Sequence, residues 1–225
     1  MKFPILLFVA LFLNKCSDKK SNYFIPEEFQ YPENKIEKGK TFIYQNALRK
    51  KITFRSIKLL NINERKYFIS KEFDSTSTTD SAIFFKGKIL EDYNFVLNGG
   101  HGATKASIAE DTVINNGSKL GKHVTEYIFN TPTTSMIVNV EDIFVKDTSC
   151  IWQGKTLDCL EIQSLAKVQF NSLTDTLSKY FLNASNLMYY AKGVGLIKYI
   201  IQFRNHNGID EYGDWELKEI KNVEN

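Results

Sequence analysis

Two cysteines in the second half of the chain are the residues whose type and spacing most directly suggest chemistry. Cys150 and Cys159 flank Gly154-Lys155, and Gly at the first central position is typical of a type II′ turn between two strands. Counting outward from that turn places the two cysteines opposite each other at a non-hydrogen-bonded position, where Cα atoms lie about 4.5 Å apart. Because this separation suits a disulfide, the sequence predicts a cross-strand disulfide between Cys150 and Cys159.

No other combination of residues has the spacing of a catalytic or metal site. Two cysteines without a nearby histidine fall short of a metal ligand set, and His101, His123 and His206 are far apart in the sequence. The acidic residues at 210–216 match no oxygen-ligand loop. Serine-hydrolase and metalloprotease motifs are absent. We therefore expect no enzyme activity, no metal and no cofactor, although a carboxylate pair assembled from distant strands stays open.

Gly193 and Gly195 have two interpretations. They could bind phosphate, but strands rather than a helix are expected after them, and no Gly-Lys-Ser element follows. They could also serve a tight chain reversal or a close backbone approach. The second interpretation is favoured, as a surface loop is for the glycine-rich residues 98–106.

The C-terminal third of the chain has the clearest strand pattern. Residues 196–204 alternate between apolar and polar side chains, which is typical of a half-buried strand. An Asn-Gly pair ending at Gly208 favours a type I′ turn into a following strand. The glycine-marked bend at residues 193–195 is expected to lead into this hairpin.

The strand after Gly208 contains a conflict of phase. Tyr212 and Trp215 have opposite parity, so a regular strand cannot direct both toward one face. A β-bulge at Gly213 or Asp214 would resolve the conflict and bring Trp215 onto the core face. The sequence therefore predicts that bulge.

The N-terminus has the features of an export signal. Residues 3–13 are an apolar run after Lys2, which is typical of a signal peptide and shorter than the roughly 20 residues needed to span a bilayer. Residues 1–15 are predicted to be the signal peptide. The cleavage-site pattern of small residues used by other secreted proteins is absent.

Residues 13–16, Leu-Asn-Lys-Cys, resemble the lipobox of bacterial lipoproteins. Leu13 matches the pattern three positions before the cysteine, whereas Lys15 stands where Gly, Ala or Ser is usual. The resemblance implies that Cys16 becomes the acylated first residue of the mature chain, carrying fatty acyl groups such as palmitate. Residues 16–25 are then expected to be a flexible, lipid-anchored tether.

The rest of the chain, residues 26–225, is predicted to be one β domain. The chain has 225 residues, and its net charge of +3 is too small to favour nucleic acid as a partner. Many short alternating segments and few helical ones predict a mainly β fold. We expect a single strongly curled antiparallel sheet, either a half-barrel or an incomplete barrel, with few short helices.

Two segments near the C-terminus resemble a group of bacterial envelope lipoproteins. Residues 190–198 read Tyr-Ala-Lys-Gly-Val-Gly-Leu-Ile-Lys, and residues 153–156 begin a less specific hairpin motif. The group is similar to the Lol lipoprotein-carrier superfamily, whose fold is an open half-barrel. The resemblance covers about the last third of the chain. It implies an envelope protein anchored in a membrane and facing the periplasm, with the outer membrane favoured over the inner.

The resulting functional hypothesis is a non-enzymatic exported lipoprotein. It would bind an apolar ligand, such as a lipid or hydrophobic peptide, or an envelope protein. The alternative is a structural or assembly subunit that pairs through an exposed strand edge. An apolar cavity of several hundred Å³ would favour the first hypothesis, and a long uncovered edge the second.

Overall fold

The computed structural model describes most of the chain from residue 24 onward. The described stretches are residues 24–48, 51–62, 65–73, 78–85, 88–89, 94–96, 103–130, 133–172, 179–204 and 210–223. Within them two short helices come first, η1 (Glu27–Phe29) and α1 (Glu33–Ile36). The strands are β1 (Lys40–Asn46), β2 (Ile52–Ile62), β3 (Arg65–Phe73), β4 (Thr78–Phe85), β5 (Lys88–Ile89), β6 (Asn94–Val96), β7 (Ala103–Ile114), β8 (Lys122–Asn130), β9 (Thr134–Trp152), β10 (Lys155–Ser172), β11 (Lys179–Ala191), β12 (Gly195–Arg204) and β13 (Asp210–Asn222).

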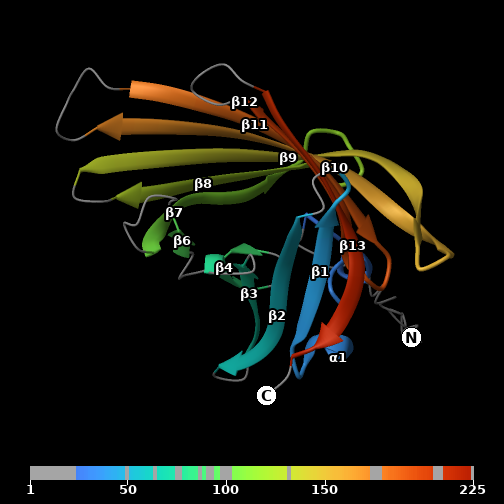
Figure 1. Ribbon diagram of the computed structural model, residues 1–225. Coiled ribbons are helices and arrows are strands. Elements are labelled where there is room, and N and C mark those ends of the chain that lie inside the picture. The colour runs from blue at the N-terminus through green and yellow to red at the C-terminus, as the bar shows by residue number, and fades with distance from the viewer. Residues whose placement is uncertain are drawn as a thin grey trace, which may run out of the picture.

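The described strands pair antiparallel in one sheet (Figure 1). Their order is β3-β2-β1-β13-β12-β11-β10-β9-β8-β7-β6-β4-β5, and β3 also pairs with β4. Most neighbours are consecutive in the chain, as expected for strands joined by hairpins. The exceptions are β4, which pairs with β6, and β1, which lies beside β13 and brings the two ends of the domain together. The mainly β, antiparallel fold with few short helices is thus confirmed.

The prediction of a strongly curled sheet is wrong. Nine long strands, from β2 through β1 and β13 to β7, form a broad sheet that is neither strongly curled nor closed on itself. Its end strands β2 and β7 do not pair with each other; β2 pairs with β3, and β7 with β6.

The bulge predicted in β13 is also absent. The β12–β13 ladder runs regularly through Gly213, which pairs with Ile201, and through Trp215, which pairs with Tyr199. Trp215 nevertheless reaches the core side, where its ring stacks on that of Tyr199 with centroids 6.0 Å apart. The prediction that Trp215 faces the core is therefore correct, but the predicted bulge is not what places it there.

The register of this hairpin explains the difference. Phe203 pairs with Glu211, whereas a two-residue turn centred on the Asn-Gly pair requires Phe203 opposite Tyr212. A one-residue change of register inverts the face of every side chain in a strand. This change of register turns Trp215 toward the core, which is the effect that the predicted bulge was expected to have. Gly208 itself lies outside the described residues.

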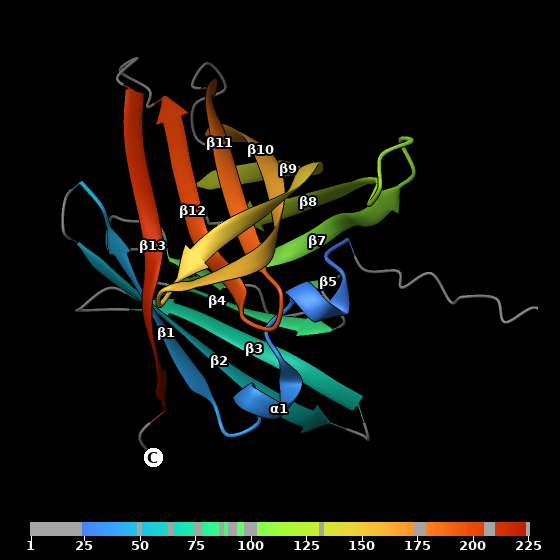
Figure 2. The ribbon, with the colours of Figure 1, turned by 90° about the vertical axis from the view of Figure 1, so that its right-hand side faces the viewer.

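The N-terminal segment of residues 24–39 packs against the sheet rather than leading freely into it. Figure 2 shows η1 and α1 lying over strands of the sheet. Ile36 of α1 is fully buried with Phe42 of β1 and Ile57 of β2, and Phe24 and Phe29 are buried against β10. Phe24 is only 6% exposed, so packing on the sheet already includes this residue, which lies within the stretch 16–25 expected to be a tether.

Tyr31 fixes this segment to the sheet through a close contact. A Cβ at Gly195 would come within 2.5 Å of the Tyr31 ring, so only glycine fits here. The Tyr31 hydroxyl lies 3.3 Å from that of Tyr44, which donates a hydrogen bond of 2.7 Å to the carbonyl oxygen of Leu196. Burial raises the pKa of Tyr44 well above its usual value, so this hydroxyl remains a donor.

Candidate functional site

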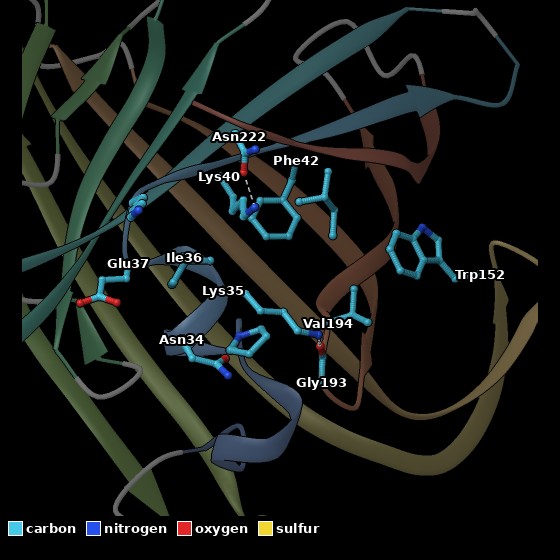
Figure 3. A pocket seen from close by; sticks show the side chains of 13 residues that line it. Asn34, Lys35, Ile36, Glu37, Lys40, Phe42, Trp152, Gly193, Val194 and Asn222 are labelled. Atoms are coloured by element: carbon cyan, nitrogen blue, oxygen red, sulfur yellow. Dashed lines mark hydrogen bonds between the residues drawn. The ribbon is translucent and has the colours of Figure 1, made fainter. Parts of the chain in front are cut away.

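A pocket of about 480 Å³ lies where α1 meets the ends of several strands (Figure 3). We call it the α1 pocket. Its lining residues come from the N-terminal segment, β1, the β9 end, the β11–β12 turn and β13: Pro32, Asn34, Lys35, Ile36, Glu37, Lys38, Lys40, Phe42, Trp152, Gly193, Val194, Ile220 and Asn222. The volume falls within the range of small-molecule sites.

The interior wall of the α1 pocket is apolar. Ile36 is 0%, Phe42 2% and Val194 9% exposed, and these side chains form part of the main hydrophobic core. Trp152 and Ile220 are half-buried and pack against the same core. Trp152 is oriented by a hydrogen bond of 3.1 Å from its indole nitrogen to the carbonyl oxygen of Leu217. The buried residues form the base of this wall, and the half-buried Trp152 and Ile220 provide the apolar surface that a ligand could contact.

Three lysines give the same pocket a basic character. Lys35 donates a hydrogen bond of 3.2 Å to the carbonyl oxygen of Gly193, and Figure 3 shows its side chain extending across the pocket toward that turn. Lys40 donates to the side-chain oxygen of Asn222. Lys38 is exposed. Among the described residues none of the three lysines forms an ion pair, and the partners of Lys35 and Lys40 are neutral oxygens.

The only carboxylate that lines the α1 pocket is that of Glu37. Figure 3 places it on the far side of α1 from Trp152. A second, more open hollow of about 510 Å³ lies beside the α1 pocket and has the opposite charge, being lined by Glu27, Glu28 and Glu33. The N-terminal segment thus separates an acidic hollow from a basic one.

A second cluster of charged residues lies on the face of the sheet that carries Phe24. His123 of β8 contacts carboxylates of both neighbouring strands, with Nε2 2.7 Å from Asp111 of β7 and Nδ1 3.2 Å from Asp142 of β9. The Phe24 ring stacks on the imidazole at 5.8 Å. All three charged side chains are less than a fifth exposed.

These contacts hold the imidazole in its charged form. Burial alone would lower the pKa of His123, but the hydrogen bonds and charges of the two aspartates outweigh it and raise the pKa to about 9. A histidine protonated at neutral pH has no free lone pair, so it is neither a general base nor a metal ligand there. The cluster is a structural ion network, and sequence alone could not reveal it because the three residues meet only through strand register.

The described residues bring together no three histidine, cysteine, aspartate or glutamate side chains in an arrangement that could hold a metal ion. His101 and His206 lie outside the described part of the chain. None of the described helices is both long and apolar enough to cross a membrane. Cys16 likewise lies outside the described residues.

The structure contradicts the predicted disulfide. Cys150 and Cys159 are free thiols, and Cys150 pairs with Leu157 while Cys159 pairs with Thr148. The turn consists of Gln153 and Gly154, both with positive φ, rather than Gly154 and Lys155. A turn one residue earlier moves the two cysteines from directly opposite to diagonal positions on one face of the hairpin.

Gly193 and Gly195 lie at the chain reversal between β11 and β12. Gly193 has a φ of +71° in the three-residue turn between β11 and β12, and its carbonyl accepts the Lys35 hydrogen bond. Gly195 has a φ of +97° and lies against Tyr31. Neither approaches a helix N-terminus of the kind that binds phosphate. Both glycines instead position the rim of the α1 pocket.

Sequence reasoning missed the α1 pocket because residues 26–39 contain no motif that indicates a binding site. One signal was present. Three lysines occur within residues 35–40 around a single isoleucine, and one turn of helix places the isoleucine on the side opposite much of that charge. Trp152, Val194 and Ile220 could not have been added, since they are distant in sequence.

The fold and the pocket define a mainly β protein with a mixed apolar and basic site. No family model matches the sequence, and no curated protein matches it either. A crystal structure of a candidate lipoprotein from Parabacteroides distasonis ATCC 8503 is similar, with a TM-score of 0.48 and 12% sequence identity over 90% of this chain and 100% of that one. At this TM-score the likeness carries no argument about function.

Proposed function

We propose that the protein is a non-enzymatic, exported lipoprotein of the bacterial cell envelope that binds an apolar ligand in the α1 pocket. It is anchored through acylated Cys16 and faces the periplasm, in the outer membrane rather than the inner one. The observation that carries the binding part of the proposal is the apolar wall of the α1 pocket, where the half-buried side chains of Trp152 and Ile220 lie over the buried core.

The anchor places this pocket close to a membrane. Cys16 precedes Phe24, the first buried residue in the described part of the chain, by eight positions. Even a fully extended chain of that length spans at most about 28 Å. An acylated Cys16 therefore keeps the N-terminal segment, and with it the α1 pocket, within reach of lipids or of hydrophobic molecules released from them.

The alternative, an assembly subunit that pairs through an exposed strand edge, has weaker support. A long free edge is what such pairing needs. In the described part of the chain both end strands of the broad sheet already have a neighbour, β3 beside β2 and β6 beside β7. By contrast, a cavity of several hundred Å³ with an apolar wall is present.

Metabolic labelling tests the anchor. Cells that express the full chain are grown with an alkyne analogue of palmitate, and the labelled protein is followed through membrane fractionation. We expect label and membrane retention for the natural chain and for Cys150→Ser, a control that removes a different cysteine. We expect neither for Cys16→Ala. Equal labelling of Cys16→Ala, or an unlabelled natural chain in the soluble fraction, would overturn lipid anchoring.

A further inference from the structure

We propose that the ligand of the α1 pocket is an anionic amphiphile, with an alkyl chain against the apolar wall and a carboxylate or phosphate head group at Lys35, Lys38 and Lys40. This inference rests on the proposed function and specifies the class of ligand. The apolar wall alone would accept any alkyl chain, so the charge of the pocket decides which molecules are favoured.

The charge balance of the lining supports an anion. Three lysines and one glutamate line the α1 pocket, so its side chains carry a net charge of +2 by subtraction of one from three. A cluster of unneutralised cations attracts an anion and disfavours another cation. The neighbouring acidic hollow, lined by Glu27, Glu28 and Glu33, repels an anion and so directs it toward the lysines.

The hydrogen bonds of the lysines support the same conclusion. Lys35 and Lys40 are held at the pocket by a backbone carbonyl and by the amide oxygen of Asn222. Bonds from an ammonium group to a charged oxygen are roughly twice as strong as those between neutral groups. A carboxylate or phosphate can therefore replace these neutral acceptors at a gain, with no existing ion pair to break among the described residues.

The arrangement also separates the two parts of the ligand. Lys35 and Lys38 are exposed and Lys40 is half-exposed, whereas the half-buried Trp152 and Ile220 offer apolar surface that lies against the buried core. The charged head can therefore remain partly hydrated while the alkyl chain enters the dry side of the pocket. A fully polar anion would make no contact with the apolar wall. A neutral hydrocarbon would make no charged interaction with the lysines.

Trp152 provides a local probe for the test. The chain has two tryptophans, and of these only Trp152 lines the α1 pocket. In the full-length Trp215→Phe variant, fluorescence reports Trp152 alone. The protein is held in a non-ionic detergent and titrated with 11-bromoundecanoic acid or 11-bromoundecan-1-ol. The two differ only in the head group, and the bromine of each quenches tryptophan on contact.

We expect the acid to quench Trp152 at lower concentration than the alcohol. The combined change Lys35→Gln, Lys38→Gln and Lys40→Gln is expected to weaken the acid about tenfold and to change the alcohol less than twofold. Lys51→Gln, Lys119→Gln and Lys167→Gln together remove the same charge away from the pocket and serve as the control. Comparing each compound with itself across variants cancels its partitioning into detergent.

The outcomes separate the two proposals. If acid and alcohol quench equally and the pocket lysines have no effect, binding of an apolar ligand stands and the anionic head group is overturned. If neither compound quenches Trp152, both proposals fail for this pocket. A brominated phosphatidylglycerol is a further arm: quenching that depends on the lysines identifies a membrane phospholipid as the source of the anionic group, whereas quenching by the acid alone identifies a free fatty acid.

Discussion

His123 is the residue at which charge and burial are most closely linked. Its ring is 13% exposed and contacts carboxylates on both sides. Since the ion network joins β7, β8 and β9 and supports Phe24, its charge state affects how the first residues of the domain pack on the sheet.

The pH dependence of stability tests this linkage. The pKa of His123 is raised from 6.5 to about 9, so the folded state holds its proton more tightly than the unfolded state. The stabilisation is complete below about pH 6.5 and is lost as the pH rises through about 9, by on the order of 2–3 kcal/mol. Urea unfolding at pH 6, 7.5 and 9 should show this loss.

His123→Gln is the control for that measurement. We expect the variant to be less stable at pH 6 and to lose much less stability between pH 6 and 9 than the natural protein. Parallel curves for the two proteins would show that a different group titrates, and the proposed role of His123 would then be wrong.

The two thiols of the β9–β10 hairpin differ in reactivity. Cys159 is 1% exposed, and burial raises its pKa, while Cys150 is half-exposed. Because the thiolate is the reactive form, we expect iodoacetamide at pH 8 to label Cys150 at least tenfold faster than Cys159, and both equally in urea. Peptide mass spectrometry measures this. Failure of both to react in urea without a reductant would indicate the disulfide that the structure lacks.

At the scale of elements, the contact between Gly195 and Tyr31 attaches the N-terminal segment to the β11–β12 hairpin. Gly195→Ala combines a positive φ with a Cβ 2.5 Å from the Tyr31 ring. We expect it to lower the free energy of unfolding by more than about 2 kcal/mol, and to weaken ligand binding because Tyr31 and α1 must move. Chemical denaturation measures the first effect.

Gly193→Ala is the matched control, two residues earlier in the same hairpin. It also has a positive φ, of +71°, but nothing lies within 4 Å of a Cβ there. Only the backbone cost of about 1 kcal/mol is expected. Equal destabilisation by the two variants would contradict the importance of the Tyr31 contact.

The positions of strands could be predicted from the sequence more accurately than the register in which neighbouring strands pair. The strand expected at residues 196–204 matches β12 to within a residue, because alternation and strand-forming residues are local signals. The turn at Gly154 was misplaced by one residue, and the predicted register between β12 and β13 was wrong by one residue. A single-residue difference changes local energies little, yet it moves the cysteines apart and removes the need for a bulge at Gly213.

At the scale of the whole molecule, the α1 pocket depends on contacts that no local pattern contains. Its residues come from positions between 32 and 222, and they meet because β1 pairs with β13 and because the N-terminal segment covers that part of the sheet. The degree to which the sheet curls could not be predicted from local sequence patterns either. It depends on accumulated bulges and twist along nine strands, not on the sequence of any one of them.

Native mass spectrometry of the full protein, extracted gently from bacterial membranes, tests the central claim most directly. We predict a chain that begins at Cys16 and carries added acyl mass, together with a ligand of amphiphile size that dissociates on collisional activation. Ile220→Gln should retain the acyl mass and lose the ligand, because it alters only the pocket wall. An unacylated chain that carries no ligand would contradict the account.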